Sequence, residues 1–383
     1  MKSNLKRIVI TYLDFSISDI NKNMIGKFCM KMNKKRNKLI KLICSAMLLM
    51  GMMFATTGCG DEQTLAGEGI NKQAYPEVVR VGSLKGPTTF GLLYMMNAGA
   101  DDATEGLKNT NEQNNYNFQM MTAADELLPL MIKGELDIAL IPANVASILY
   151  GKMDGNLKVI DINTLGVLYM VSGNGEIDDL KDLEGQTVYL TGKGTTPDYV
   201  LRYLLAQANV DVNKINLEFK AEATEVAAML AERPDAVGLL PQPFVTAALT
   251  QNDKLSVVLD LTEQWDNLQG DTAEASRMVT GVTVVRGEFL EQYPQAVEQF
   301  LKDHAESAEY VNSNVEQAAT WAALQGIIAK EPLAKKAIPQ CNIVCIDGEE
   351  MKKALSGYLQ VLFEQSAESV GGKLPTEDFY FVN

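Results

Sequence analysis

The stretch that decides the fold is Val79-Arg-Val-Gly-Ser-Leu-Lys-Gly-Pro-Thr-Thr-Phe-Gly-Leu-Leu-Tyr94, which returns in altered form as Val188-Tyr-Leu-Thr-Gly-Lys-Gly-Thr-Thr-Pro-Asp-Tyr-Val-Leu-Arg-Tyr203. Each copy has a β-rich run, a Lys-Gly turn, a Thr pair beside a Pro, and then an apolar helical pattern. Gly frees the backbone at such a turn, Thr before an apolar run is typical of a helix N-cap, and Pro suits the first helical turn. The pattern predicts a strand–turn–helix unit whose helix end can meet an anion or a polar ligand head.

A second pair of similar segments follows the first pair along the chain. The segment Ala124–Pro142 resembles Ala223–Pro241, at an offset of 98 or 99 residues, whereas the offset at Lys85 and Lys193 is 108. The first copy therefore holds about nine extra residues, which we place in the polar run Asn97–Asn115. Repeated matches in one order favour one α/β unit used twice. The alternative is two generic units that look alike by chance.

Residues 31–58 predict an export signal of a lipoprotein, so we expect residues 1–58 as a whole to be a leader. Lysines and one arginine between Lys34 and Lys41 form a basic segment, and the uncharged run Leu42–Thr57 follows it. This run is shorter than the roughly 20 residues of a membrane span. It ends in small residues directly before Cys59, like the cleavage box of a lipoprotein. We therefore expect a lipid on Cys59 and a tether over residues 59–76, which would hold the protein on the extracytoplasmic face of the cell membrane.

The N-terminal residues and the net charge lead to two further predictions, one on the start codon and one on the partners of the protein. Residues 1–29 fit no part of a signal, so we place the true start at Met30 or Met32. Removal of residues 1–58 leaves 23 Lys and Arg against 47 Asp and Glu, a net charge of −24. Such a charge argues against a nucleic-acid partner. The remaining 325 residues suffice for two domains of ordinary size.

Two cysteines remain in the body of the protein, Cys341 and Cys345. On an extended strand their Cα atoms lie about 13 Å apart, which is too far for a disulfide. We interpret them as small buried residues on one strand face. The only histidine, His304, falls in a helical pattern, and there is no Cys-x-x-Cys motif, so neither a metal site nor a cofactor is predicted.

Strands alternate with helices along the body, which predicts two open, mostly parallel sheets with crossover connections. We expect lobe I over residues 77–165 and 282–383 and lobe II over 166–281, joined by a two-segment hinge that carries Thr280 and Gly281. The apolar run Leu165–Val171 is predicted to be the first connection. The expected strands are 79–83, 118–122, 138–142, 158–163, 188–190, 217–220, 237–240, 257–261, 278–285 and 343–346. The expected helices are 91–96, 126–133, 144–149, 197–207, 226–231, 245–250, 287–312 (with a new start at Pro294), 315–328 and 349–363.

Two such sheets bind ligands in the crevice beyond the carboxyl ends of their strands. The loops there offer hydrogen-bond donors and helix ends but no nucleophile–base pair and no carboxylate dyad, which predicts a binding protein rather than an enzyme. The candidate ligand-binding residues are Ser83, Lys85, Gly86, Pro87, Thr88, Thr89, Thr122, Pro142, Ala143, Asn144, Thr191, Lys193, Gly194, Thr195, Thr196, Gln242 and Thr280.

Alternatives remain open for the residues singled out. Lys85 and Lys193 either flank an anionic head or point into solvent. The paired threonines either donate to ligand or serve as N-caps, and Tyr199 either stacks on a heteroaromatic ring or covers the core. The lysines favour a small anion or zwitterion. Charges in these loops are otherwise confined to Asp125 and Glu222, which disfavours an amino acid.

The body, from Glu77 to the C-terminus, resembles a known family. Together with Cys59, the runs Val81-Gly-Ser-Leu-Lys-Gly-Pro-Thr88, Glu135-Leu-Asp-Ile-Ala-Leu-Ile-Pro-Ala-Asn144 and Leu239-Leu-Pro-Gln-Pro-Phe244 resemble substrate-binding lipoproteins of ATP-driven (ABC) importers. The branch is the nitrate, sulfonate and taurine family, whose relatives also capture pyrimidine precursors of thiamine. The resemblance implies a two-lobed, hinge-closing periplasmic-binding-protein fold of type II, a monomer, and a permease with ATPase subunits as partner.

Two other functions stay open. A lipoprotein of this fold can sense a ligand and signal to a membrane partner. Relatives of the fold also include thiamine-pyrimidine synthases, which rely on a Cys-rich run and a His near the cleft. This sequence has no such run, and His304 lies in the late helical region.

Overall fold

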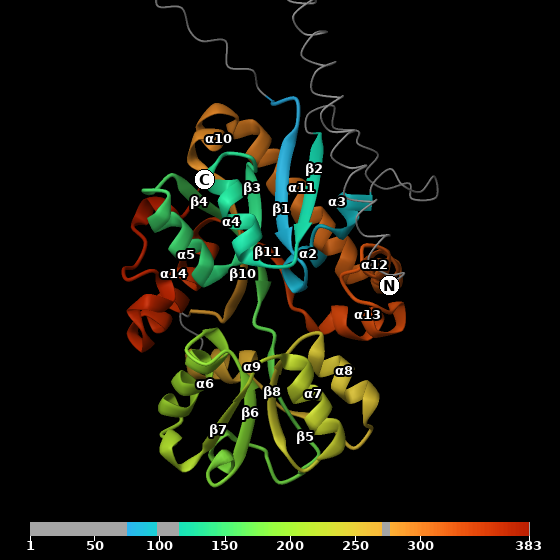
Figure 1. The fold of residues 1–383 in the computed structure, drawn as a ribbon. Helices are drawn as coiled ribbons and strands as arrows, with labels where there is room; N and C mark the ends of the chain where they lie inside the picture. Colours follow the sequence, from blue (N-terminus) through green and yellow to red (C-terminus); the bar gives the residue numbers. More distant parts are fainter. Residues whose placement is uncertain (1–74, 98–114, 270–275, 383) are drawn as a thin grey trace, which may run out of the picture. The chain divides into compact units, whose positions relative to one another are not determined.

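The computed structural model describes residues 75–97, 115–269 and 276–382, which belong to one compact unit. The predicted signal, Cys59, the start codon and the extra residues of the first repeat lie outside these ranges. Among the described residues, no helix has the length and apolar character needed to cross a membrane. The described chain is built on two sheets (Figure 1).

The first sheet has six strands in the order β11-β4-β10-β3-β1-β2, and we call it with its helices lobe I. Strand β3 is apolar throughout because both of its faces are covered, as expected for a central strand. The bounds are β1 Val79–Leu84, β2 Tyr116–Met121, β3 Ile138–Pro142, β4 Leu157–Leu165, β10 Val279–Arg286 and β11 Ile343–Ile346.

The second sheet has five strands in the order β7-β6-β8-β5-β9, and we call it with its helices lobe II. Read from the other end, this order is β9-β5-β8-β6-β7, which matches β4-β10-β3-β1-β2 of lobe I strand for strand. The predicted repeat is therefore confirmed at the level of topology. The bounds are β5 Leu168–Ser172, β6 Thr187–Thr191, β7 Asn216–Lys220, β8 Val237–Pro241 and β9 Ser256–Asp260.

Each sheet contains a reversed strand that the alternating pattern did not predict. Strands β1, β2 and β3 pair in parallel, but β10 lies between β3 and β4 and is antiparallel to both. In the same way β5 lies between β8 and β9 and is antiparallel to both. In lobe I the edge strand β11 is also reversed, because it is antiparallel to β4. Four strands of each sheet therefore share one direction. The inserted strands β10 and β5 are each formed by the segment of chain that has just crossed from the other lobe. The carboxyl ends of the four co-directional strands meet at one edge of each sheet.

The helices follow the predicted pattern with three differences. The expected helix 91–96 is two short helices, α2 and α3, which are separated at Gly91 and Leu92, and the helices α9 and α13 were not predicted. The long helix α11 begins at Pro294 as expected and buries Ala296, Val297, Phe300 and Leu301. The bounds in lobe I are α2 Pro87–Phe90, α3 Leu93–Asn97, α4 Ala124–Ile132, α5 Ala143–Lys152, α10 Gly287–Gln292, α11 Pro294–Ser313, α12 Val315–Leu324, α13 Glu331–Ala337 and α14 Gly348–Gln365. Those in lobe II are α6 Thr196–Gln207, α7 Ala223–Glu232, α8 Phe244–Gln251 and α9 Leu261–Gln269.

The first connection between the lobes is shorter than predicted. Because β4 extends to Leu165 and β5 begins at Leu168, only Gly166 and Val167 join the two sheets. A side chain at Gly166 would collide with Met278 and Thr262, so glycine permits the close approach there. On the return, Thr280 and Gly281 are residues of β10 in the lobe I sheet, so the lobe boundary that we proposed after residue 281 falls within this strand.

The lobes also contact one another away from the connection. Trp265 of α9 is fully buried, and its ring centroid lies 5.6 Å from that of Tyr358 on α14. Tyr358 forms a side-chain hydrogen bond with Thr196 at the start of α6, and its burial raises its pKa. On β5, the hydroxyl of Tyr169 donates to the carbonyl of Gln340 at 2.9 Å. These contacts hold lobe II against C-terminal segments of lobe I.

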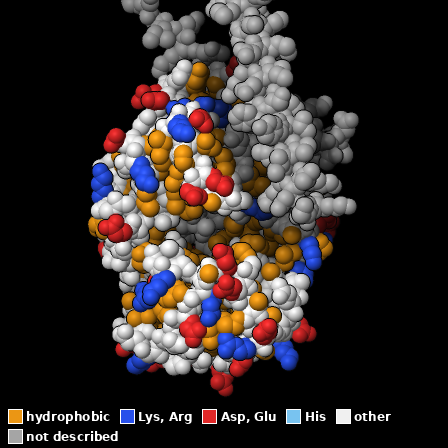
Figure 2. All heavy atoms as spheres, viewed as in Figure 1, with side chains coloured by type: hydrophobic (Ala, Val, Ile, Leu, Met, Phe, Trp, Pro, Cys, Tyr) orange, Lys and Arg blue, Asp and Glu red, His pale blue; other side chains and the backbone are white. Residues whose placement is uncertain are grey.

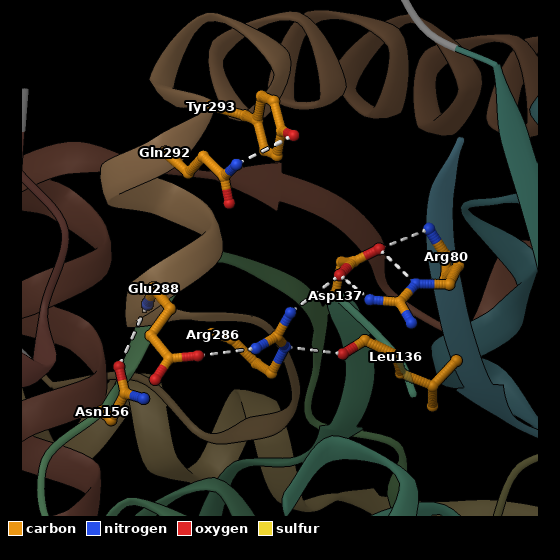
Figure 3. A network of polar contacts seen from close by, with 8 residues as sticks. All are labelled: Arg80, Leu136, Asp137, Asn156, Arg286, Glu288, Gln292 and Tyr293. Carbon is orange, nitrogen blue, oxygen red and sulfur yellow. Dashed lines mark hydrogen bonds and ion pairs between the residues drawn. The ribbon is translucent and has the colours of Figure 1, made fainter. Parts of the chain in front are cut away.

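A charged network joins three strands at the edge of the lobe I sheet where β1 and β3 begin (Figure 3). Asp137 directly precedes β3, and its carboxylate accepts from Arg80 of β1 and from Arg286, the last residue of β10. Nε of Arg286 also donates to the carbonyl of Leu136 at 2.9 Å. The network binds the amino ends of β1 and β3 together and leaves their carboxyl ends as the edge available to a ligand.

Candidate functional site

The candidate site of lobe I lies at the carboxyl edge of its sheet. The ends of β1, β3 and β4 reach this edge, and so does the beginning of the reversed strand β10. Gly281 is in register with Pro142 on one side and with Thr164 on the other. A side chain on Gly281 would lie 2.4 Å from an oxygen of Asn163 and 2.5 Å from a methyl group of Thr88, so the edge is closely packed at its centre.

The Lys-Gly turn of lobe I uses its hydroxyl groups within the protein. Gly86 has a φ of 143°, a backbone conformation that favours glycine. It is the N-cap residue of α2, so no side chain caps this helix. Thr88 and Thr89 donate to the carbonyl of Leu84, at 3.2 and 2.6 Å, and the hydroxyls of Thr89 and Ser83 lie 2.9 Å apart. All three hydroxyl side chains are buried. The two threonines are therefore not N-caps, contrary to one of our alternatives, and instead fasten the helix to the end of β1.

The corresponding turn of lobe II carries a buried carboxylate that the sequence analysis overlooked. Asp198 is 4% exposed in the first turn of α6. One of its oxygens accepts from the backbone N–H of Gly194 at 2.9 Å, and the other from Nε of Arg202 at 2.6 Å. A carboxylate in this position already occupies the place where a helix end attracts an anion. The turn itself closes through Thr195, whose hydroxyl donates to the carbonyl of Gly192 at 2.7 Å.

The two lysines of the turns are both exposed. Nζ of Lys193 lies 5.7 Å from the centroid of the Phe219 ring, within the range of a cation–π contact. Lys85 and Lys193 follow equivalent strands, each of which lies second from the outer edge of its sheet. Lys85 comes directly after β1, and Lys193 follows β6 after Gly192. Their positions suit either contact with an anionic ligand or exposure to solvent.

Other predicted residues also bond within the protein. Glu126 accepts from Thr122, the amide of Asn144 donates to the carbonyl of Ser369 at 3.3 Å, and the buried Gln242 accepts from Thr246 at 2.8 Å. Thr122 is exposed, and the remaining positions at these edges are half-buried or buried. They are Pro142, Ala143, Thr191, Thr196 and Thr280. Pro87, in the first turn of α2, is also half-buried, whereas Gly194 is exposed.

The two carboxyl edges are held close together by the chain itself. Leu165 ends β4 at one edge and Leu168 begins β5 at the other, and two residues between them span no more than about 10 Å. In lobe II, the N–H of Gln242, directly after β8, donates to the carbonyl of Val167 at 3.0 Å. Figure 2 shows that the viewed surface is hollowed between the two lobes. The predicted ligand-binding residues of both turns thus come from edges that adjoin.

A row of buried polar side chains beneath the lobe I edge was also missed. Thr283 of β10 donates to Asp161 of β4 at 2.7 Å and lies 3.3 Å from the amide of Asn163, whose oxygen accepts from Thr164. All four residues are at most 1% exposed. The signal in the sequence was the polar set Asp161, Asn163 and Thr164 in a strand whose other residues, apart from Lys158, are apolar. Such a network costs free energy unless it is fully paired, so it fixes the geometry of the edge.

The groups at these edges suit non-covalent recognition. The edges present hydroxyl, amide and lysine groups together with helix ends, which suit a small polar molecule held by hydrogen bonds. Asp198 and Arg202 add one charged pair on lobe II. The residues of the two turns form no nucleophile–base pair among themselves in the part of the chain that the structure describes.

Solved structures with the same fold are described as an ABC transporter and as sulphonate- and nitrate-binding proteins. An ABC transporter protein from Parabacteroides distasonis is 24% identical with a TM-score of 0.63, and the match covers 80% of this chain and 99% of that one. The periplasmic aliphatic sulphonate binding protein SsuA from Escherichia coli is 16% identical with a TM-score of 0.62, covering 80% and 92%. The periplasmic nitrate-binding protein NrtA from Synechocystis PCC 6803 is 14% identical with a TM-score of 0.53, covering 77% and 85%. The predicted periplasmic-binding-protein fold of type II is confirmed, as is the resemblance to sulfonate- and nitrate-binding proteins.

A family model with the description "Menaquinone biosynthesis" matches residues 87–338. No curated protein matches the chain at a significant level. The family match begins at Pro87, directly after the first Lys-Gly turn, and includes the whole of lobe II. The fold of the chain is that of type II periplasmic binding proteins. Because the family match covers well over half of the sequence, the chain belongs to this menaquinone-biosynthesis family.

Proposed function

We propose that this protein is the extracytoplasmic solute-binding component of an ABC importer. The observation that carries the proposal is the pairing of two equivalent strand–turn–helix ends, at Lys85–Thr89 and Lys193–Pro197, at sheet edges joined by two residues. A small solute between such edges makes hydrogen bonds to both lobes. Closure then follows because ligand contacts to both lobes favour the closed state over the open one. The closed form is what the permease and its ATPase subunits recognise.

The solute that fits best is small and polar. Lys85 and Lys193 favour a sulfonate-, taurine- or nitrate-like anion, and the neighbouring hydroxyl and amide groups also suit a pyrimidine-like precursor. On the lobe II side, the negative charge of the buried Asp198 disfavours a compact anion, and the ion pair with Arg202 offsets this charge. An anionic head bound nearer to lobe I, with an uncharged remainder against lobe II, meets both conditions.

The proposal includes a lipid anchor at Cys59 and a monomeric binding unit. The lipid would hold the protein on the outer face of the membrane, and the polar residues 59–76 would let the folded body reach the permease. Metabolic labelling with a fatty-acid analogue tests the anchor. Label on the wild-type chain but not on Cys59→Ser supports it, whereas equal labelling of both chains contradicts it.

The family match supports a second candidate function, an enzyme that acts on a menaquinone precursor. A binding protein and an enzyme differ in what they do to the bound molecule. A sensor that signals to a membrane partner is a third reading, which a neighbouring sensor-kinase gene would favour over an importer.

One experiment separates the first two functions. The lipid-free body, residues 60–383, is screened by thermal shift against alkanesulfonates, taurine, nitrate, hydroxymethylpyrimidine analogues and aromatic carboxylic acids related to menaquinone. A ligand at a hundred times its dissociation constant adds about 2.7 kcal/mol to the free energy of unfolding. Any hit is then incubated with the protein and recovered. Recovery of unchanged ligand supports a solute-binding component. Recovery of a new product, formed over several turnovers, would identify an enzyme and contradict the proposal.

A further inference from the structure

A buried cluster of three different side chains lies in lobe I, away from both turns. Asp161 comes from β4, His304 from α11, and Cys345 from β11, which pairs with β4. One oxygen, one ring nitrogen and one sulfur of these residues all lie within 4.8 Å of one another. Asp161 and His304 are completely buried, and Cys345 is half-buried. Three elements far apart in sequence thus bring together the O, N and S donors that zinc accepts in proteins.

The histidine is not fully paired within the protein. Its Nδ1 lies 3.0 Å from an oxygen of Asp161, but its Nε2 is buried without a hydrogen-bond partner in the described part of the chain. An unpaired buried polar atom carries a desolvation cost, so it calls for an explanation. A Cβ at Gly91 would lie only 2.9 Å from this nitrogen, so a side chain at that position would collide with it.

The thiol of Cys345 is likewise weakly bonded. It donates to the carbonyl of Leu301 at 4.0 Å, which is long even for a thiol. Cys341 provides the contrast, because its thiol donates to the carbonyl of Ala337 at 3.1 Å, as a core cysteine does, and it does not belong to the cluster. The two cysteines, which we first interpreted alike, therefore differ in their surroundings.

We propose that Asp161, His304 and Cys345 bind a divalent cation of the zinc class. Zinc bonds of roughly 2.0–2.3 Å place tetrahedral ligand atoms about 3.3–3.7 Å apart, so small side-chain shifts suffice to close the cluster. Asp161 is either a direct ligand, or it holds Nδ1–H while Nε2 binds the cation, in the manner of a carboxylate–histidine–zinc group. The fixed bond from Thr283 to the other oxygen of Asp161 orients the carboxylate for either role.

A surface pocket is lined by residues close in sequence to His304 and Cys345. The pocket has a volume of about 280 Å³, and its lining includes Leu301 and Ala305, which flank His304 on α11, and Asp347, two residues beyond Cys345. The charged residues of its wall are the two carboxylates of Glu298 and Asp347 and the ammonium group of Lys302, a net charge of −1 that favours a cation over an anion. The cation would stabilise lobe I beneath the ligand edge, since Asp161 belongs to the buried polar row that ends at Thr164.

The test uses the purified mature protein, stripped with a chelator under reducing conditions and titrated with Co²⁺ and Zn²⁺. We expect one equivalent of Co²⁺ to produce a thiolate-to-metal charge-transfer band, and Zn²⁺ to displace it. Cys341→Ser is the matched control and should keep the band. Cys345→Ser should lose the band and bind at least 100-fold more weakly. A wild-type protein without a saturable one-equivalent band, or a band that Cys345→Ser retains, overturns the proposal.

A second measurement does not depend on the folding of a variant. Native wild-type protein is treated with a thiol-alkylating reagent with and without Zn²⁺, and each cysteine is quantified by mass spectrometry. Zinc should slow the modification of Cys345 and leave the rate at Cys341 unchanged. Equal rates at Cys345 in both conditions contradict a cation at this thiol. Asp161→Asn then distinguishes the two arrangements, since loss of binding indicates a ligand and a 10- to 100-fold weakening indicates an orienting role.

Discussion

The carboxylate of Asp137 accepts a hydrogen bond from Nε of Arg80 at 2.8 Å, and its side chain is only 1% exposed. Arg286 reaches the same carboxylate at 3.0 Å, so one buried anion joins three strands of the lobe I sheet. Its removal leaves two guanidinium groups without their shared partner. We therefore expect Asp137→Ala to lower the free energy of unfolding by about 3 kcal/mol. Urea unfolding at pH 7 measures this loss.

The same network supplies the control for that prediction. Glu288 pairs with Arg286 at 3.2 Å, but its side chain is 73% exposed. Water screens such a pair, so Glu288→Ala should cost less than about 1 kcal/mol. If the two variants lose equal stability, the burial of Asp137 has no special weight and the prediction fails.

Gly281 should tolerate no side chain at the centre of the candidate site. A Cβ there would lie 2.4 Å from Asn163 and 2.5 Å from Thr88. We expect Gly281→Ala to destabilise the protein by about 1–3 kcal/mol, through overpacking, and to weaken ligand binding. Gly151 in α5 has open space around it, and Gly151→Ala should leave stability unchanged or raise it by up to about 1 kcal/mol. Thermal unfolding of both variants provides the comparison.

The exposed lysines of the two turns should matter only for an anionic ligand. If a sulfonate binds, loss of a charge-assisted hydrogen bond in Lys85→Ala or Lys193→Ala should weaken affinity about tenfold each. Lys254 is also exposed and precedes β9 at the opposite edge of the lobe II sheet, so Lys254→Ala is the matched control. Isothermal titration of all three variants decides the question. Unchanged affinity in both turn variants would assign these lysines to solvent.

Trp265 should report closure of the lobes. Its ring lies against Tyr358 of lobe I and Tyr203 of its own lobe, with centroids 5.6 and 4.7 Å apart. A rotation between lobes changes the first contact and leaves the second intact. In Trp321→Phe, which keeps Trp265 as the sole tryptophan, we expect bound ligand to change the emission. A ligand that binds without altering this emission argues against closure at this contact.

Asp378 should make stability sensitive to acid. Lys158, Thr376 and Tyr150 hold the pKa of this carboxyl well below its usual range, chiefly through the hydrogen bond from Lys158. A lowered folded-state pKa contributes stability that is present above the unfolded-state value, about 3.9, and is lost as pH falls below it. Because Asp378 is exposed, the effect is small and sensitive to salt.

The measurement for Asp378 is the midpoint of urea unfolding between pH 2.5 and 7. Asp378→Asn should lose stability at pH 7 and show a shallower decline in acid than the wild type. Asp253→Asn, at an exposed turn before β9, is the control and should follow the wild-type profile. Parallel profiles for Asp378→Asn and the wild type would contradict the assigned role.

The sequence by itself determined the strands, the turns and the repeat, because these follow from local properties. Alternating strand and helix patterns placed β3 and β11 to the residue, and the Lys-Gly turns marked equivalent points of both lobes. The insertion of β10 and β5 as reversed strands escaped prediction, because the partner of a strand depends on where the returning chain finds an open edge. The short helices α9 and α13 escaped for the related reason that packing, not a strong pattern, stabilises them.

Only the tertiary structure decided what each polar side chain does. The hydroxyls of Thr88 and Thr89 and the carboxylate of Asp198 have their partners within the fold, which spacing along the chain does not reveal. Asp161 and His304 are 143 residues apart in sequence and share a hydrogen bond. Periodicity reports which face of an element is buried, but the meeting of polar groups depends on how separate elements pack. Local sequence therefore predicted the strands, the turns and the repeat. The buried cluster with Cys345 forms only because three separate elements pack together.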